Sequence, residues 1–170
     1  MKTDDRSWFD PLVRNLGDRA LRFATMLVGD VDTAQEIVQE AFVRSWISPK
    51  TPSIEPDFRR WLYRVIANLA RDYHRERARR ITLPISSPTS LDPLERIEQR
   101  SEDYRVLAAV RMLKPRERQA IYLRYFEDLS FADTSRILGS PQVSVRVLVH
   151  RALGKLRRQL AADLVKEVAV

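Results

Sequence analysis

Residues 129–160 read LSFADTSRILGSPQVSVRVLVHRALGKLRRQL, and this stretch decides the fold of the C-terminal half. Ser130 is a favourable helix N-cap, and a carboxylate three residues later approximates a capping box. Gly139 is suited to end that helix, because glycine tolerates the left-handed backbone of a helix C-terminus. Ser140 and Pro141 then restart the chain as the N-cap and first residue of a second helix. The pattern predicts a helix-turn-helix motif.

The second helix of this motif divides into a buried and an exposed face. At about 100° per residue, its apolar positions fall on one side. They are Val145, Val149, Ala152 and Leu156. The opposite side carries Arg146, Val147, His150, Arg151, Arg157 and Arg158. No acidic residue occurs from 144 to 160, as expected of a helix that enters the DNA major groove. A plain helical hairpin with a basic exterior is the alternative.

The composition of the whole chain favours a polyanionic partner. Its 170 residues carry a formal net charge of +7, and basic surfaces attract phosphates. No run approaches the roughly 20 apolar residues of a membrane span, and the N-terminal residues lack the apolar stretch of a signal peptide. The absence of cysteine excludes disulfides and thiolate metal sites. These features are compatible with a cytoplasmic protein, and the charge alone leaves nucleic-acid binding and its absence as equal alternatives.

Residues suited to catalysis are missing from the sequence. The four glycines, at positions 17, 29, 139 and 154, are too scattered for a phosphate-cradling loop. The two histidines, His74 and His150, lie in basic helical stretches, where a solvated or phosphate-facing role is expected. Most carboxylates alternate with basic residues at helical spacing, the pattern of a solvated face. The sequence predicts no enzyme, no catalytic residue, no metal site and no cofactor.

Helical periodicity runs almost from end to end, and strand signals are nearly absent. The expected helices span residues 7–28, 31–47, 57–80, 97–113, 115–127, 130–139 and 142–164. Residues 81–95 read ITLPISSPTSLDPLE, whose three prolines remove backbone donors and disfavour helix. We predict an all-α chain of two small helical domains, 1–80 and 97–170, joined by a flexible linker at 81–96. A surface loop within one domain is the alternative.

Residues 58–80 read FRRWLYRVIANLARDYHRERARR and mix aromatic side chains with many arginines. One face of this helix is expected in the core. It contains Phe58, Leu62, Val65, Ile66, Leu69 and Tyr73. The opposite stripe contains Arg60, Arg64, Arg71 and Arg75, and Trp61 and Asn68 lie on the flank. Basic side chains follow phosphates, an aromatic ring stacks on an unpaired base, and an amide bonds base edges. These features favour single-stranded nucleic acid, with a core-edge tryptophan and a solvated asparagine as the alternative.

The preceding helix, residues 30–46, has an acidic surface on a basic protein. Its expected buried stripe contains Ala34, Ile37, Val38, Ala41, Phe42 and Ser45. Its outer face carries Asp32, Glu36, Gln39 and Glu40. An acidic helix beside a basic one suits a protein that holds a protein partner and a nucleic acid together. Ordinary solvated surface is the alternative.

Three stretches together resemble bacterial RNA polymerase sigma factors of the extracytoplasmic-function group, which contain only the second and fourth conserved regions. The stretches are DTAQEIVQEAFVRSW, FRRWLYRVIANLARDYHRER and LKPRERQAIYLRYFEDLSFADTSRILGSPQVSVRVLVHRALGKLR, and they occur in the family's order. The resemblance implies a transcription initiation factor. Its implied partners are core RNA polymerase, duplex promoter DNA, the melted non-template strand and an anti-sigma factor.

The resemblance also implies roles for the matching residues. Core polymerase would dock, through the clamp helices of its largest subunit, on Asp32, Glu36, Gln39 and Glu40. The minus-ten element would be melted and held by Arg60, Trp61, Arg64, Asn68, Arg71 and Arg75. The loop from Ile47 to Pro56 would complete the pocket for a flipped base. The minus-thirty-five element would be read by Ser144, Arg146, Val147, His150, Arg151 and Arg158.

The second domain departs from the family at several positions. The usual glutamate-isoleucine-alanine of its first motif helix is here Asp133-Thr134-Ser135, which loses an apolar residue. A common serine-arginine pair is here Val147-Leu148, so a phosphate contact is expected to be lost. Val147 stays on the exposed face, where it would meet a thymine methyl.

Two other functions are compatible with the sequence. One is a stand-alone helix-turn-helix regulator that binds duplex DNA by itself, and the other is a protein-interaction module that mimics a sigma factor. The flank formed by Trp61 and Asn68 argues against the first, because it serves melted DNA and has no use on a closed duplex.

Overall fold

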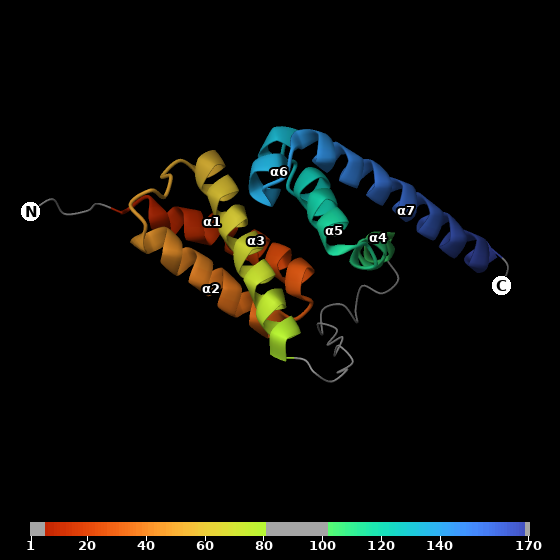
Figure 1. Ribbon diagram of the computed structural model, residues 1–170, viewed down its shortest axis with the longest axis horizontal. Coiled ribbons are helices and arrows are strands. Elements are labelled where there is room, and N and C mark those ends of the chain that lie inside the picture. The colour runs from red at the N-terminus through yellow and green to blue at the C-terminus, as the bar shows by residue number, and fades with distance from the viewer. Residues whose placement is uncertain (1–5, 81–101, 169–170) are drawn as a thin grey trace, which may run out of the picture. The chain divides into compact units, whose positions relative to one another are not determined.

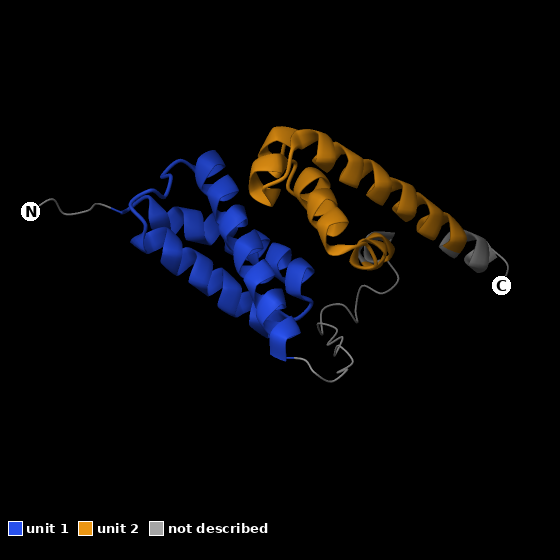
Figure 2. Ribbon diagram, viewed as in Figure 1, with its two compact units in different colours: residues 1–89 blue, residues 90–170 orange. Residues whose placement is uncertain are grey.

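The computed structural model describes residues 6–80 and 102–168, and every element within them is helical (Figure 1). The chain divides into two compact units, residues 1–89 and residues 90–170 (Figure 2). The prediction of an all-α chain with two helical domains is confirmed. The predicted linker, 81–96, and the first residues of the helix expected at 97–113 lie outside the described residues. None of the described helices has the length and apolar character that a membrane span requires.

Unit 1 is a three-helix bundle in which each helix contacts the other two. It consists of α1 (Phe9–Val28), α2 (Val31–Ile47) and α3 (Glu55–Arg80). The turn between α1 and α2 is short because Gly29 adopts a left-handed φ of 89° and its N–H bonds the carbonyl of Thr25. Asp30 then caps α2, accepting a 2.8 Å hydrogen bond from the backbone of Thr33.

Aromatic rings connect the helices of this bundle. The Phe9 ring lies 5.9 Å from that of Phe58 and 5.1 Å from that of Trp46, so α1 contacts α3 and α2 through one residue. The rings of Phe23 and Tyr63 are 5.0 Å apart, and both side chains are fully buried. Aromatic pairs in such T-shaped and tilted arrangements stabilise a core beyond their burial alone.

The buried face of α3 differs from the predicted one. Phe58, Leu62 and Ile66 are buried as expected, but Val65, Leu69 and Tyr73 are only half-buried. The prediction missed Tyr63, Ala67 and Ala70, which are buried. The physical reason is that α3 packs against two helices, which buries a face rotated from the purely apolar one. On α2 the predicted stripe is buried at Ala34, Ile37, Ala41 and Ser45, while Val38 and Phe42 are half-buried.

Unit 2 is built around one long helix. Its elements are α4 (Glu102–Arg111), α5 (Pro115–Ile121), the π-helical turn η2 (Tyr122–Phe126), α6 (Phe131–Leu138) and α7 (Gln142–Val168). Helix α7 contacts α4, α5 and α6. Its predicted core positions Val145, Val149, Ala152 and Leu156 are all buried. The helix expected at 115–127 widens into η2, where the Tyr122 and Phe126 rings stack 5.1 Å apart.

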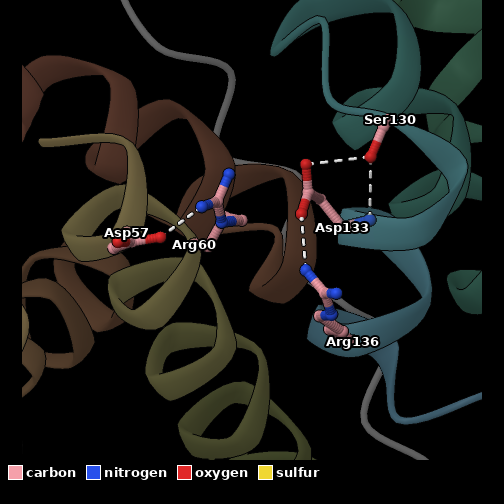
Figure 3. A network of polar contacts seen from close by, with 5 residues as sticks. All are labelled: Asp57, Arg60, Ser130, Asp133 and Arg136. Carbon is pink, nitrogen blue, oxygen red and sulfur yellow. Dashed lines mark hydrogen bonds and ion pairs between the residues drawn. The ribbon is translucent and has the colours of Figure 1, made fainter.

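The predicted helix-turn-helix is present as α6 and α7. The Ser130 hydroxyl accepts a 3.0 Å bond from the Asp133 backbone and donates a 2.9 Å bond to the Asp133 carboxylate, which also pairs with Arg136 (Figure 3). Gly139 ends α6 with a left-handed φ of 59°. The expected capping role of Ser140 is wrong, because its hydroxyl instead accepts a 2.9 Å bond from Arg116 and so joins the turn to α5.

An internal ion pair joins α5 to α7. Both carboxylate oxygens of Glu117 lie 2.8 Å from Nζ of Lys155, and one of them accepts a 3.3 Å bond from the backbone of Lys114. The Glu117 side chain is only 5% exposed. Desolvation by burial raises the pKa of Glu117, but the hydrogen bonds from Lys155 and Lys114 outweigh it, so the pKa is lowered overall.

This ion pair predicts an acid-sensitive unit 2. Because the folded pKa of Glu117 lies below its unfolded value, the carboxylate stabilises the fold fully above about pH 4.5, and this is lost as pH falls through the lowered pKa. Glu117→Gln should lower the urea midpoint of unit 2 at pH 7. It should also make the urea midpoint fall less steeply between pH 5 and pH 3. Unfolding of unit 2 can be followed by the NMR signal of the Lys155 amide. A decline as steep as the wild type's would contradict the assignment.

One polar atom of α6 is buried in the core of unit 2 and lowers the stability of that unit. The hydroxyl of Thr134 is fully buried and finds no hydrogen-bond partner among the described residues. Thr134→Val keeps the shape and removes this hydroxyl, so it should stabilise unit 2 by about 1 kcal/mol. Ser135→Ala is the matched control, because its hydroxyl donates a 2.6 Å bond to the Ser140 carbonyl and its loss should destabilise the unit. Hydrogen exchange at the Val149 amide measures the stability of unit 2 in both variants. The same change in stability in both variants would contradict the cost assigned to the Thr134 hydroxyl.

Candidate nucleic-acid interface

The outer face of α3 collects the predicted basic and aromatic residues. Arg64, Asn68, Arg71 and Arg75 are exposed, and Arg60 and Trp61 are half-buried. These six positions fall within an arc of about 100° on an ideal helix. The buried residues of α3 lie on the opposite side, so burial of the core face holds the whole set towards solvent.

Two arginines of this face pair with carboxylates one turn away on α3. Arg60 pairs with Asp57 (Figure 3), and Arg75 lies 3.7 Å from the carboxylate of Asp72. The exposed pair of Arg75 and Asp72 contributes only about 0–1 kcal/mol, so a phosphate can replace this carboxylate at little cost. The carbonyl oxygen of Asn68 accepts a 3.3 Å bond from Arg71. That bond orients the amide of Asn68 and places its acceptor next to a cation.

The aromatic residues of α3 have different positions. Tyr63 is fully buried and belongs to the core, whereas Trp61 keeps part of its ring accessible on the arginine face. Of these two, only Trp61 is therefore available to stack on a base. The tryptophan that precedes the loop between α2 and α3 is a further candidate that sequence reasoning missed, because Trp46 is 46% exposed and its ring lies 4.9 Å from the guanidinium of Arg6.

His74 has a structural contact that its sequence context did not suggest. Its Nε2 lies 2.9 Å from the carbonyl oxygen of Leu27 at the end of α1. A carbonyl only accepts, so Nε2 carries the proton in this contact. The residue is exposed, as expected of a solvated side chain, and this contact additionally ties α3 to α1.

The acidic face of α2 is separate from the core of the bundle. Asp32, Glu36, Gln39 and Glu40 are all exposed, as predicted. Glu40 accepts a 2.8 Å hydrogen bond from Arg44 one turn later, a contact between two half-exposed side chains. Glu36 and Glu40 lie one turn apart and present two carboxylates to a partner on one line of the helix.

The outer face of α7 is the basic surface expected of a reading helix. Ser144, Arg146, Val147, His150, Arg151 and Arg158 are all exposed, and Leu148 lies at the edge of the buried face. The guanidinium of Arg146 lies 4.5 Å from the ring of Phe131 on α6, and that of Arg124 lies 4.6 Å from the same ring. Phe131 thus orients Arg146, a role that spacing along the sequence did not indicate. No group of three potential metal ligands occurs within the described part of the chain.

Two stretches of the chain match known protein families. Residues 12–80 match the family described as Sigma-70 region 2, and residues 104–156 match Sigma-70, region 4. The RNA polymerase sigma-E factor of Streptomyces coelicolor is 30% identical, over 91% of this chain and 86% of that protein. The extracytoplasmic-function sigma factor SigW of Bacillus subtilis is 26% identical, over 94% and 92%.

A solved structure shares the same fold. The sigma factor RpoE of Bartonella quintana, crystallised with the anti-sigma factor NepR, matches with a TM-score of 0.70 at 21% identity. The match covers 91% of this chain and 98% of that one. At this identity the likeness concerns the fold.

His74 and Arg75 are adjacent on α3 and should have opposite effects when substituted. His74→Ala removes the bond to Leu27 and should destabilise unit 1 by about 1 kcal/mol, with single-stranded DNA binding unchanged at temperatures where the variant is folded. Arg75→Ala should leave the melting temperature unchanged and weaken that binding, most strongly at low salt. Thermal melting and fluorescence anisotropy measure the two effects. Weaker binding by a fully folded His74→Ala would indicate a phosphate-facing role.

Proposed function

The chain belongs to the sigma-70 family as an extracytoplasmic-function RNA polymerase sigma factor, and we propose that its two units divide promoter recognition between them. As a sigma factor it serves transcription initiation at promoters and is a regulator of transcription. In the proposal, unit 1 binds core polymerase and holds the melted minus-ten element, and unit 2 reads the minus-thirty-five element as duplex.

The exposed face of α3 carries this proposal. Recognition of a melted strand needs cations for the backbone, a ring for stacking and an amide for a base edge. Arg64, Trp61 and Asn68 supply one of each on a single face, and Asn68 is already oriented by Arg71. A regulator that binds closed duplex through its helix-turn-helix alone has no use for such a face on a second unit.

The outer face of α7 supports the assignment of unit 2. An exposed arginine such as Arg146 can bond guanine in the major groove with both arms of its guanidinium, which contributes about 1–3 kcal/mol of discrimination. Val147 is 42% exposed and is suited to a thymine methyl. Acidic residues, which would repel the DNA backbone, are absent from this face.

Core polymerase and an anti-sigma factor are the proposed protein partners. The acidic face of α2 is suited to a basic surface on the clamp helices of the largest polymerase subunit, because its carboxylates are exposed and outside the bundle core. The Bartonella relative binds an anti-sigma factor, and we propose a partner of that kind for this chain. Both partners place the protein in the cytoplasm with the polymerase.

Core docking should depend on the acidic face of α2. Glu36→Arg combined with Glu40→Arg reverses two exposed charges and should weaken core binding at least tenfold while leaving helicity unchanged. Pull-down with core polymerase, followed by promoter-dependent transcription in vitro, measures both steps. Glu76→Arg on α3 is the control, since it reverses an exposed charge on another helix. Core binding that survives in the double variant would remove α2 as the docking surface.

Asn68 should act after the closed complex has formed. Asn68→Ala removes the amide that bonds a base edge, so it should lower permanganate reactivity of unpaired thymines at the minus-ten element, compared at equal polymerase occupancy. A template already unpaired there should restore most of the activity, because unstacking no longer opposes binding. Arg75→Ala is the contrast, and its defect should persist on both templates and grow with salt. Wild-type reactivity in Asn68→Ala would defeat the proposed role of α3.

A further inference from the structure

Unit 2 contains a solvent-open concavity between α5 and α7. Its volume is about 410 Å³, and its wall combines the start of α5 with one face of α7. The lining residues are Lys114, Glu117, His150, Arg151, Gly154, Lys155 and Arg158. Four of them, Lys114, Glu117, Gly154 and Lys155, lie outside the predicted reading set.

The charge of this concavity points to an anionic occupant. Lys114, Arg151, Lys155 and Arg158 provide four permanent cations against the single carboxylate of Glu117. That carboxylate is buried and engaged with Lys155 through both oxygens, so it faces the cation more than the solvent. An ammonium group has three donors, and two contacts to Glu117 leave one for a ligand. Glu117 therefore acts as a positioning residue that holds Lys155 in the wall.

Gly154 indicates that the space itself matters. Glycine is among the least favourable residues in a helix interior, and Gly154 lies well inside α7. No neighbouring atom requires it, because a Cβ built there would meet nothing within 4 Å. What the glycine provides is an open floor between His150 and Arg158, where a ligand can approach the helix backbone.

We propose that this concavity is a phosphate-binding seat, filled by a backbone phosphate of the duplex beside the face that α7 reads. A phosphate group matches the charge and hydrogen-bond donors of the concavity, because several cations with free N–H donors surround the open surface at Gly154. The volume exceeds that of a bare phosphate, which suits a phosphodiester with its neighbouring sugars. The seat itself rests on the geometry of unit 2, whereas the DNA as its source rests on the proposed function. A free phosphate or nucleotide is the other source of the same group.

Two variants test the seat while keeping both members of the pair of Glu117 and Lys155. Gly154→Leu fills the floor with a better helix former, so it should keep or raise the melting temperature while abolishing phosphate binding. Lys114→Met removes an exposed cation at the N-cap of α5, which is not part of the reading helix. Arg111→Met is the matched control, because it removes an exposed cation of the same unit that does not line the concavity.

The first measurement is an NMR titration of the full chain with inorganic phosphate at constant ionic strength, against chloride. Saturable shifts should be confined to the amides around Lys114, Gly154 and Lys155, persist in Arg111→Met, and disappear in Gly154→Leu. Lys114→Met should weaken the phosphate affinity at least threefold. Shifts spread evenly over unit 2, or retained in Gly154→Leu, would overturn the seat.

The second measurement identifies the source of the phosphate through the salt dependence of duplex DNA binding. If DNA fills the seat, Lys114→Met should reduce the slope of log affinity against log salt by about 0.9, and Arg111→Met should leave it unchanged. An unchanged slope together with confined phosphate shifts would support the seat and assign it to free phosphate or nucleotide. Failure of promoter-dependent transcription would defeat the proposed function while leaving the NMR result intact.

Discussion

In each unit one long helix buries one face against its neighbours, and the candidate nucleic-acid surfaces of the molecule depend on that constraint. In unit 1, α3 buries Phe58, Leu62 and Tyr63 against α1 and α2. In unit 2, α7 buries Val145 and Val149 against its shorter neighbours. A helix that is fixed on one side has a defined opposite side, so the exposed arginines of both helices are held towards solvent, where most of their contacts are local ones such as Arg75 with Asp72.

The same constraint explains which parts of the fold could be predicted from sequence. The predicted buried face of α7 was correct at its four core positions, because one apolar stripe packs against a compact set of neighbouring helices. The predicted buried face of α3 was rotated relative to the observed one, because a helix that packs against two others also buries small and aromatic residues such as Ala67 and Tyr63. Capping geometry was correct at Ser130 and Gly139, where the partner is local. The capping prediction was wrong at Ser140, where Arg116 on another helix donates a hydrogen bond to the hydroxyl.

The candidate surfaces show a similar division. Exposure of Glu36, Asn68 and Arg151 was predictable, since it follows from periodicity alone. Contacts between distant segments were not, as the bond between His74 and Leu27 illustrates, and neither was the concavity that joins Lys114 to α7 across some 40 residues of sequence. Departures from the family pattern also have unequal consequences, because Thr134 leaves a buried hydroxyl without a partner among the described residues, whereas Val147 only changes an exposed contact.

The position of Arg146 over the Phe131 ring has a consequence for the thermodynamics of recognition. A free arginine side chain loses up to roughly 2 kcal/mol of rotamer entropy when it is fixed on a base. The ring 4.5 Å away already restricts those rotamers before any DNA arrives, so part of that entropic cost is met during folding of unit 2. In the proposed reading of DNA by Arg146, association would then resemble the docking of a rigid side chain, with a smaller entropy penalty and a narrower tolerance for sequences that do not fit its fixed direction.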